Sequence, residues 1–173
     1  MSETKTLATV WLDGCSGCHM SLLDMDERLI ELSSQFTLVY SPLVDRKTFP
    51  EHVDVTLVEG AVASEDDLKK IRKIREHTGV LVSLGDCALT GNVSAMRNRY
   101  GPGPVLLRVY PEGQTAPVTG VPALLDRVRP VHEVVPVDVF VPGCPPSAET
   151  IYQVLAELLA GRVPTLEGVA HFG

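Results

Sequence analysis

The sequence predicts an α/β fold in which a doubly wound, flavodoxin-like parallel sheet carries helices on both faces. Short apolar runs of strand length alternate with amphipathic stretches of helix length, and this order produces parallel sheets. The chain has 173 residues, of which 45% are hydrophobic and 21% charged. One domain spanning residues 1–173, with a substantial buried core, is therefore expected.

Apolar runs bounded by polar or turn-forming residues predict the strands. The expected strands are Thr6–Leu12, Phe36–Tyr40, Val53–Val58, Val80–Leu84 and Val137–Val141. Apolar side chains at helical spacing predict the helices. The expected helices are His19–Leu32, the segment 64–78, a short one after Thr90, and Ser147–Ala160 ended by Gly161.

Two details concern the ends of these elements. Ser64 and Asp67 have the spacing of a capping box, which predicts that Ser64 caps the helix following it. Gly79 stands where a left-handed C-cap of that helix is expected. Between residues 100 and 136, prolines and glycines interrupt the periodicity, so this stretch is expected to be a loop with one short helix near Val121–Val128.

All four cysteines follow expected strands. Cys15 and Cys18 form a Cys-Ser-Gly-Cys pair, while Cys87 and Cys144 lie far away in the sequence. Because the carboxyl ends of parallel strands share one edge, where such folds bind cofactors, the four thiols are expected to meet there. Glycines lie within two positions of these cysteines and let the backbone approach an anionic cluster closely. This pattern predicts a four-thiolate metal centre.

Two other readings of the cysteines remain open. A thioredoxin-like redox pair would need only Cys15 and Cys18. A structural zinc site also uses four thiolates, although its ligands usually come as two local pairs. His19 is expected to be a helix-start residue rather than a ligand. Asp13 and Asp86 are expected to be turn residues, and the Lys and Arg side chains of segment 64–78 a solvated face.

Composition excludes several classes of protein. The net charge is −7, and no basic stripe with interleaved aromatic residues is present, which argues against a nucleic-acid binder. No apolar run approaches the length of a membrane span, and no export signal is evident. A cytoplasmic protein with reduced thiols is therefore expected, where cysteine patterns more often indicate metal or redox chemistry than disulfides.

Four motifs resemble the small subunit of nickel–iron hydrogenases. They are Cys15-Ser-Gly-Cys18-His-Met-Ser, Leu57-Val-Glu-Gly-Ala-Val62, Leu84-Gly-Asp-Cys87-Ala-Leu-Thr-Gly-Asn92 and Val141-Pro-Gly-Cys144-Pro-Pro-Ser147. The resemblance implies that the four cysteines hold one proximal 4Fe–4S cluster. It also implies that Glu59 and Gly60 lie at the cluster-side interface with the large subunit, the chain that carries the nickel–iron centre.

Among these small subunits, the chain most resembles the short one of soluble, bidirectional, NAD(P)-linked hydrogenases. That resemblance implies electron transfer between the large subunit and a diaphorase partner that bears flavin, further iron–sulfur clusters and the NAD(P) site. The related cluster-bearing subunit of respiratory complex I is the alternative. It typically places two adjacent cysteines where this chain has Cys15-x-x-Cys18.

Overall fold

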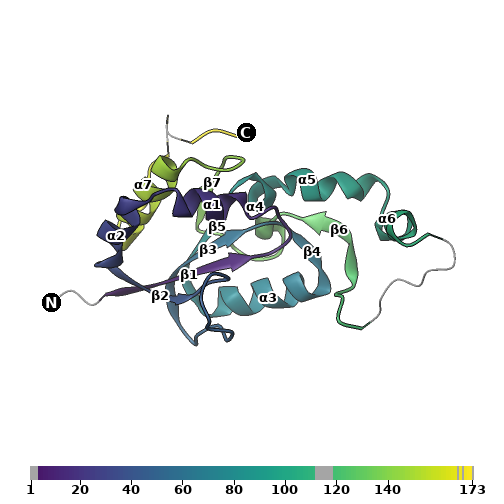
Figure 1. Cartoon of the computed structure of the whole chain (residues 1–173), viewed down its shortest axis with the longest axis horizontal. Coiled ribbons are helices and arrows are strands. Elements are labelled where there is room, and N and C mark those ends of the chain that lie inside the picture. The colour runs from purple at the N-terminus through teal and green to yellow at the C-terminus, as the bar shows by residue number, and fades with distance from the viewer. Residues whose placement is uncertain (1–3, 112–118, 167, 169, 173) are drawn as a thin grey trace.

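A five-stranded parallel sheet forms the centre of the molecule (Figure 1). The structure is a computed structural model, and it describes residues 4–111, 119–166, 168 and 170–172. The strands are β1 (Lys5–Trp11), β2 (Phe36–Tyr40), β3 (Val53–Glu59), β5 (Thr78–Leu84) and β7 (Val139–Val141). Their order across the sheet, β2-β1-β3-β5-β7, is the flavodoxin-like order. The predicted fold class is confirmed.

Helices cover both faces of this sheet. The helices of the described ranges are α1 (Gly17–Leu23), α2 (Glu27–Ser33), α3 (Glu65–Glu76), α4 (Asp86–Thr90), α5 (Asn92–Ala95), α6 (Pro102–Val109) and α7 (Ala148–Leu159), with 3-10 turns η1 (Met96–Arg99) and η2 (Val131–Glu133). Leu57 and Leu155 belong to the core under α1, α2 and α7, and Val58 and Ile71 belong to the core on the α3 side. None of the helices in the described ranges has the length and apolar character to cross a membrane.

Two expectations about helix ends are wrong. The predicted helix His19–Leu32 is two helices, because Asp26 has φ 48°, which a right-handed helix does not allow. The segment 64–78 forms α3, but its C-cap is His77. Gly79 instead lies within β5, where an added Cβ would be 2.9 Å from the carbonyl oxygen of Asp54 on β3. Gly79 therefore permits close strand approach rather than ending a helix.

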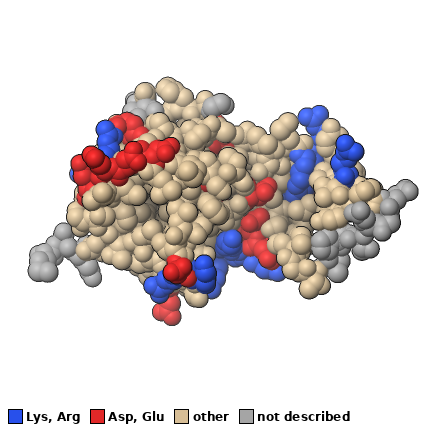
Figure 2. All heavy atoms as spheres, in the orientation of Figure 1, with Lys and Arg blue, Asp and Glu red and all other residues tan. Residues whose placement is uncertain are grey.

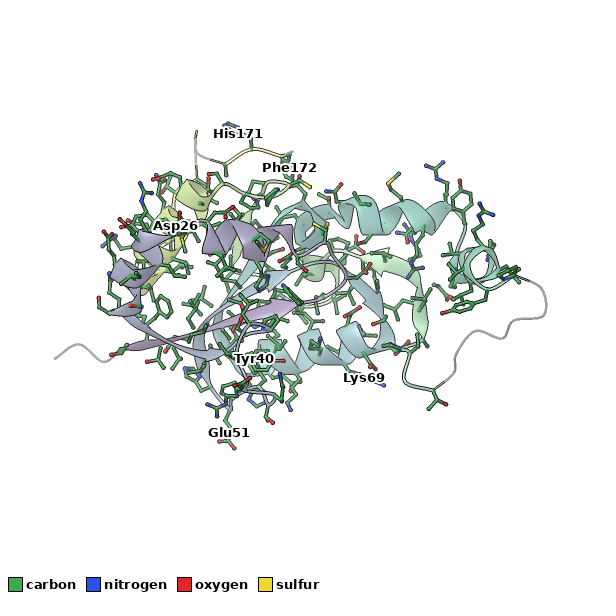
Figure 3. The ribbon with its side chains drawn as sticks, viewed as in Figure 1. Asp26, Tyr40, Glu51, Lys69, His171 and Phe172 are labelled. Carbon is green, nitrogen blue, oxygen red and sulfur yellow. The ribbon has the colours of Figure 1, made fainter. Side chains whose placement is uncertain are left out.

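The start and the exposed face of α3 are as predicted. The hydroxyl of Ser64 accepts a hydrogen bond from the Asp67 N–H at 3.1 Å, and the Asp67 carboxylate accepts one from the Ser64 N–H at 3.0 Å. Lys69 projects from α3 into solvent (Figure 3). Figure 2, in the same orientation as Figure 1, shows Lys and Arg side chains along the lower side of the molecule, where α3 lies. Arg75 also pairs with Asp138 at 2.6 Å, so the face is mainly but not wholly solvated.

Residues 100–136 contain more regular structure than expected. The segment predicted to be a short helix near Val121–Val128 contains β6 (Leu124–Arg129), which pairs antiparallel with β4 (Val62–Ser64). The Asn98 side chain holds this strand, since it accepts from the Val128 N–H at 2.8 Å and donates to the Val128 carbonyl at 2.9 Å. Helix α6 occupies part of the expected loop, and residues 112–118 lie outside the described ranges.

Candidate metal centre

Three loops at the carboxyl edge of the sheet carry the four cysteines. Cys15 and Cys18 follow β1, Cys87 follows β5, and Cys144 follows β7. These strands flank β3 or lie next to each other, so their loops meet at one rim. All four thiols are free; Cys18 is buried, Cys87 is partly buried, and the other two are exposed. The structure therefore brings together the four side chains that the sequence predicts.

Electrostatics show that the four thiols lie near one another. The pKa of Cys18 is raised, and burial of the thiol is the largest cause. The nearby charges of Glu59 and of the other three thiols raise this pKa further. Burial also raises the pKa of Cys87, followed by Cys144, Cys15 and Glu59, while a hydrogen bond from a backbone N–H opposes that shift. Because thiolates in such surroundings repel one another, a positively charged metal centre would relieve that repulsion.

The spacing of these groups is wider than that of a one-ion site. Among the described residues, no three Cys, His, Asp or Glu side chains converge closely enough to hold a single metal ion. The donor set at the rim is nevertheless made of thiols, the ligands that iron–sulfur clusters use.

Backbone hydrogen bonds tie the loop of Cys87 to that of Cys144. The Gly85 N–H donates to the Val141 carbonyl at 2.8 Å, and the Asp86 N–H donates to the Gly143 carbonyl at 2.9 Å. In return the Asp86 carboxylate accepts the Gly143 N–H at 2.7 Å. Asp86 is buried and so positions both loops, a role that its interpretation as a turn residue missed.

Glycine at position 85 leaves room for a sulfur atom. Its φ is 80°, and an added Cβ would lie 2.3 Å from the Sγ of Cys18. A Cβ at Gly17 would lie 3.3 Å from the Sγ of Cys15. The rim is thus a cradle lined by thiols and by backbone without side chains. The donor set and this cradle fit an iron–sulfur cluster.

A buried acid–imidazole pair lies beneath the cysteines. The Glu59 carboxylate accepts the His19 backbone N–H at 3.0 Å, and the same oxygen contacts the His19 Nδ1. Both residues are buried, His19 at 2% and Glu59 at 3% exposure. The edge of the Trp11 ring meets the His19 ring with centroids 5.3 Å apart. Within the described residues, the His19 Nε2 has no hydrogen-bond partner.

Sequence reasoning missed this pair. His19 lies in the first turn of α1, as predicted, and the interface position that the resemblance implies for Glu59 and Gly60 stays a prediction. Within this chain both Glu59 and Gly60 are buried. Strand β3 lies between β1 and β5, so its last residue falls in the middle of the cysteine loops. Only the strand order reveals that position.

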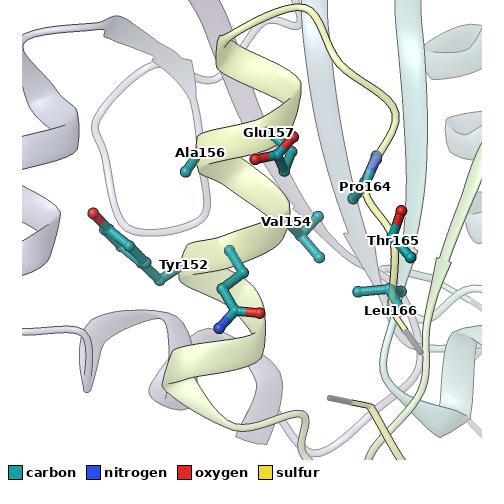
Figure 4. A pocket seen from close by; sticks show the side chains of 8 residues that line it. Tyr152, Val154, Ala156, Glu157, Pro164, Thr165 and Leu166 are labelled. Atoms are coloured by element: carbon teal, nitrogen blue, oxygen red, sulfur yellow. The ribbon is translucent and has the colours of Figure 1, made fainter. Parts of the chain in front are cut away.

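A separate groove runs beside α7 (Figure 4). Its lining residues are Tyr152, Gln153, Val154, Ala156, Glu157, Pro164, Thr165 and Leu166. None of the four cysteines lines it. Its carboxylate, on Glu157, is paired with Arg162 at 2.5 Å, so the groove adds no reactive group to the candidate centre.

The fold and the rim define a class of protein: an α/β protein of flavodoxin-like topology with four thiols at the carboxyl edge of its sheet. Residues 15–158 match the family described as the 20 kDa subunit of NADH ubiquinone oxidoreductase. Subunit delta of the NAD-reducing hydrogenase HoxS of Cupriavidus necator is 42% identical over 90% of this chain and 79% of its own length. The chain belongs to this family, and within it to the small subunits of NAD-reducing nickel–iron hydrogenases.

Solved structures agree with this assignment. A chain of an NAD⁺-reducing nickel–iron hydrogenase in its H2-reduced state superposes with a TM-score of 0.94 at 37% identity, covering 99% of this chain and all of that one. A nickel–iron–selenium hydrogenase chain from Dm. baculatum has a TM-score of 0.61 at 18% identity, covering 92% of this chain and 62% of that one, and shows the shared fold alone. Several other hydrogenase subunits are longer, since the chain spans 56–60% of their length.

Proposed function

We propose that this chain is the electron-transferring small subunit of an NAD(P)-linked nickel–iron hydrogenase and holds one proximal 4Fe–4S cluster through Cys15, Cys18, Cys87 and Cys144. The observation that carries the proposal is the meeting of these thiols at one rim of a flavodoxin-like sheet. The proposed iron–sulfur-binding unit is a single domain over residues 1–173. When bound, a cluster of this type accepts and releases one electron at a time.

The residues of this chain act by holding and shielding that group. Hydrogen bonds between the loops after β5 and β7 fix two ligands relative to each other. The glycines leave backbone, rather than side chains, against the sulfurs. Because electron transfer makes and breaks no bond in the protein, positioning and tuning of the cluster are the expected contributions of the chain.

Exposed apolar side chains on the segments that follow Cys18 and Cys87 support an obligate partner. Cys15 and Cys144 are exposed, and Met20, Val93 and Met96 are 57–64% exposed. Large apolar side chains gathered at a functional rim are typical of protein interfaces. The proposed partners are a large subunit with the nickel–iron centre and a diaphorase module with flavin, iron–sulfur clusters and the NAD(P) site. We propose a cytoplasmic assembly, because the cysteine pattern indicates metal chemistry rather than disulfides.

The first test is the metal content of the complex that copurifies anaerobically with the chain. Iron together with about one nickel per complex is expected. Iron without nickel would favour the alternative, an electron carrier of the complex I type. The matched family, which is named for a subunit of NADH ubiquinone oxidoreductase, supports this alternative. Zinc alone would contradict both proposals and favour a structural thiolate site.

The second test removes one proposed ligand. In a complex carrying Cys144→Ala, hydrogen-driven reduction of NAD(P) should be lost, because the electron path through this chain lacks its cluster. Hydrogen–deuterium exchange needs only the partner's nickel–iron centre and should persist, which controls for assembly. Retained hydrogen-driven NAD(P) reduction in this variant would contradict the proposal.

A further inference from the structure

The side chain of Asn92 reaches one of the four proposed ligands. Its amide nitrogen Nδ2 lies 3.5 Å from the Sγ of Cys144, across 52 positions of sequence. A metal-bound thiolate has no hydrogen to donate, so only the amide N–H can usefully face it. The contact is therefore a side-chain N–H···S hydrogen bond, a type of interaction that tunes the potential of iron–sulfur clusters.

The backbone at this position makes the choice of residue informative. Gly91 has φ 82° and Asn92 has φ 35°, a left-handed conformation in which glycine is the least strained residue. Asparagine is among the few side-chain-bearing residues that tolerate it. The Asn92 N–H also donates to the Thr90 hydroxyl at 3.3 Å, which in turn donates to the Asp86 carbonyl. The backbone at position 92 would therefore accept glycine, so the conformation alone does not explain why the residue there is asparagine.

The neighbouring residue supplies a second hydrogen bond. The Val93 backbone forms a hydrogen bond with the Cys87 side chain. Two consecutive residues thus form hydrogen bonds with two of the four thiols. The Val93 side chain is itself 64% exposed, so a partner that covers it would also shield these bonds from water and strengthen them.

We infer that Asn92 is a tuning residue, whose hydrogen bond to Cys144 raises the reduction potential of the group held by the four thiolates. The inference rests on the proposed function, because it requires Cys144 to be a ligand. Reduction adds one electron, supplied by the oxidation of hydrogen, and hence one negative charge to the thiolate-bound group. An N–H donor to sulfur stabilises the more negative state, so it favours reduction.

The test is an EPR-monitored redox titration of the intact complex. Asn92→Gly keeps the positive φ and removes the donor. At a fixed potential it should lower the ratio of reduced to oxidised cluster about tenfold, which for a one-electron couple is a midpoint about 59 mV lower. Asn92→Asp replaces the donor by a negative charge and should lower the midpoint further. Ser94 lies two residues after Asn92, and its hydroxyl donates a hydrogen bond to the Asp13 carbonyl. Ser94→Ala removes that bond and should leave the midpoint potential unchanged.

Iron content, measured in every sample, separates the possible failures. A midpoint for Asn92→Gly that matches the wild-type value overturns the inference, even if Asn92→Asp is lower, because charge alone would then explain the result. Loss of iron from Asn92→Gly also overturns it, since Asn92 would then be structural. A wild-type complex whose iron–sulfur signals all persist in the Cys144→Ala complex contradicts the proposed function itself, whatever the Asn92 variants do.

Discussion

Gly85→Ala is expected to disrupt the candidate centre by displacing Cys18. The added Cβ would lie 2.3 Å from the Cys18 Sγ, and Gly85 has φ 80° and ψ 160°. Holding alanine in that backbone region costs about 1–3 kcal/mol, and relieving the overlap costs about 1–3 kcal/mol more. For a chain of this size, a total of about 2–6 kcal/mol lowers the unfolding temperature by roughly 4–24 °C.

Gly101 offers a matched control for this substitution. It has nearly the same backbone conformation, φ 71° and ψ 176°, but an added Cβ there would meet no heavy atom within 4 Å. Gly101→Ala should therefore carry the conformational cost alone and keep its iron. The assay is the iron content and thermal unfolding of complexes purified anaerobically. Full iron content in Gly85→Ala, with the same unfolding temperature as Gly101→Ala, would refute the reasoning.

Two further predictions concern the fold around the site. Ser64→Ala removes half of the capping box at the start of α3 and should cost about 0.5–2 kcal/mol, seen as a lower unfolding temperature; an unchanged temperature would show that the cap is dispensable. Hydrogen bonds from the Thr6 hydroxyl and N–H hold the pKa of Asp54 below its ordinary value. The stability this provides is complete above about pH 3.9 and is lost as pH falls through the lowered pKa. Thr6→Val should therefore show a smaller drop in unfolding temperature between pH 5 and pH 3 than the wild type does, and an equal drop would contradict this account.

Local sequence signals were sufficient where a single element decides its own structure. Ser64 and Asp67 lie three residues apart and can satisfy each other's backbone without any distant partner, so the capping box is predictable. The periodicity of the last helix similarly locates α7, with Ser147 as its N-cap. Both predictions depend on residues within a single helix.

Predictions failed where distant contacts decide the structure. β6 is a strand because it pairs with β4 and because Asn98 holds Val128 in an extended backbone, and neither partner is adjacent in sequence. Gly79 has the position of a C-cap in the sequence, yet the approach of Asp54 from the neighbouring strand determines its use. The break at Asp26 between α1 and α2 likewise had no recognised local signal.

The sequence by itself determined the alternation of strands and helices, and therefore a parallel sheet whose carboxyl edge gathers the four cysteines. This follows because periodicity and turn residues act locally, and because parallel strands leave their carboxyl ends on one side. Only the tertiary structure decided what surrounds the thiols. The Glu59–His19 pair, the Asp86 link and the Asn92 donor depend on strand order and on loops that meet across 40 to 57 positions. Hydrogen bonds over such separations are fixed by packing of the whole domain rather than by neighbours in the chain.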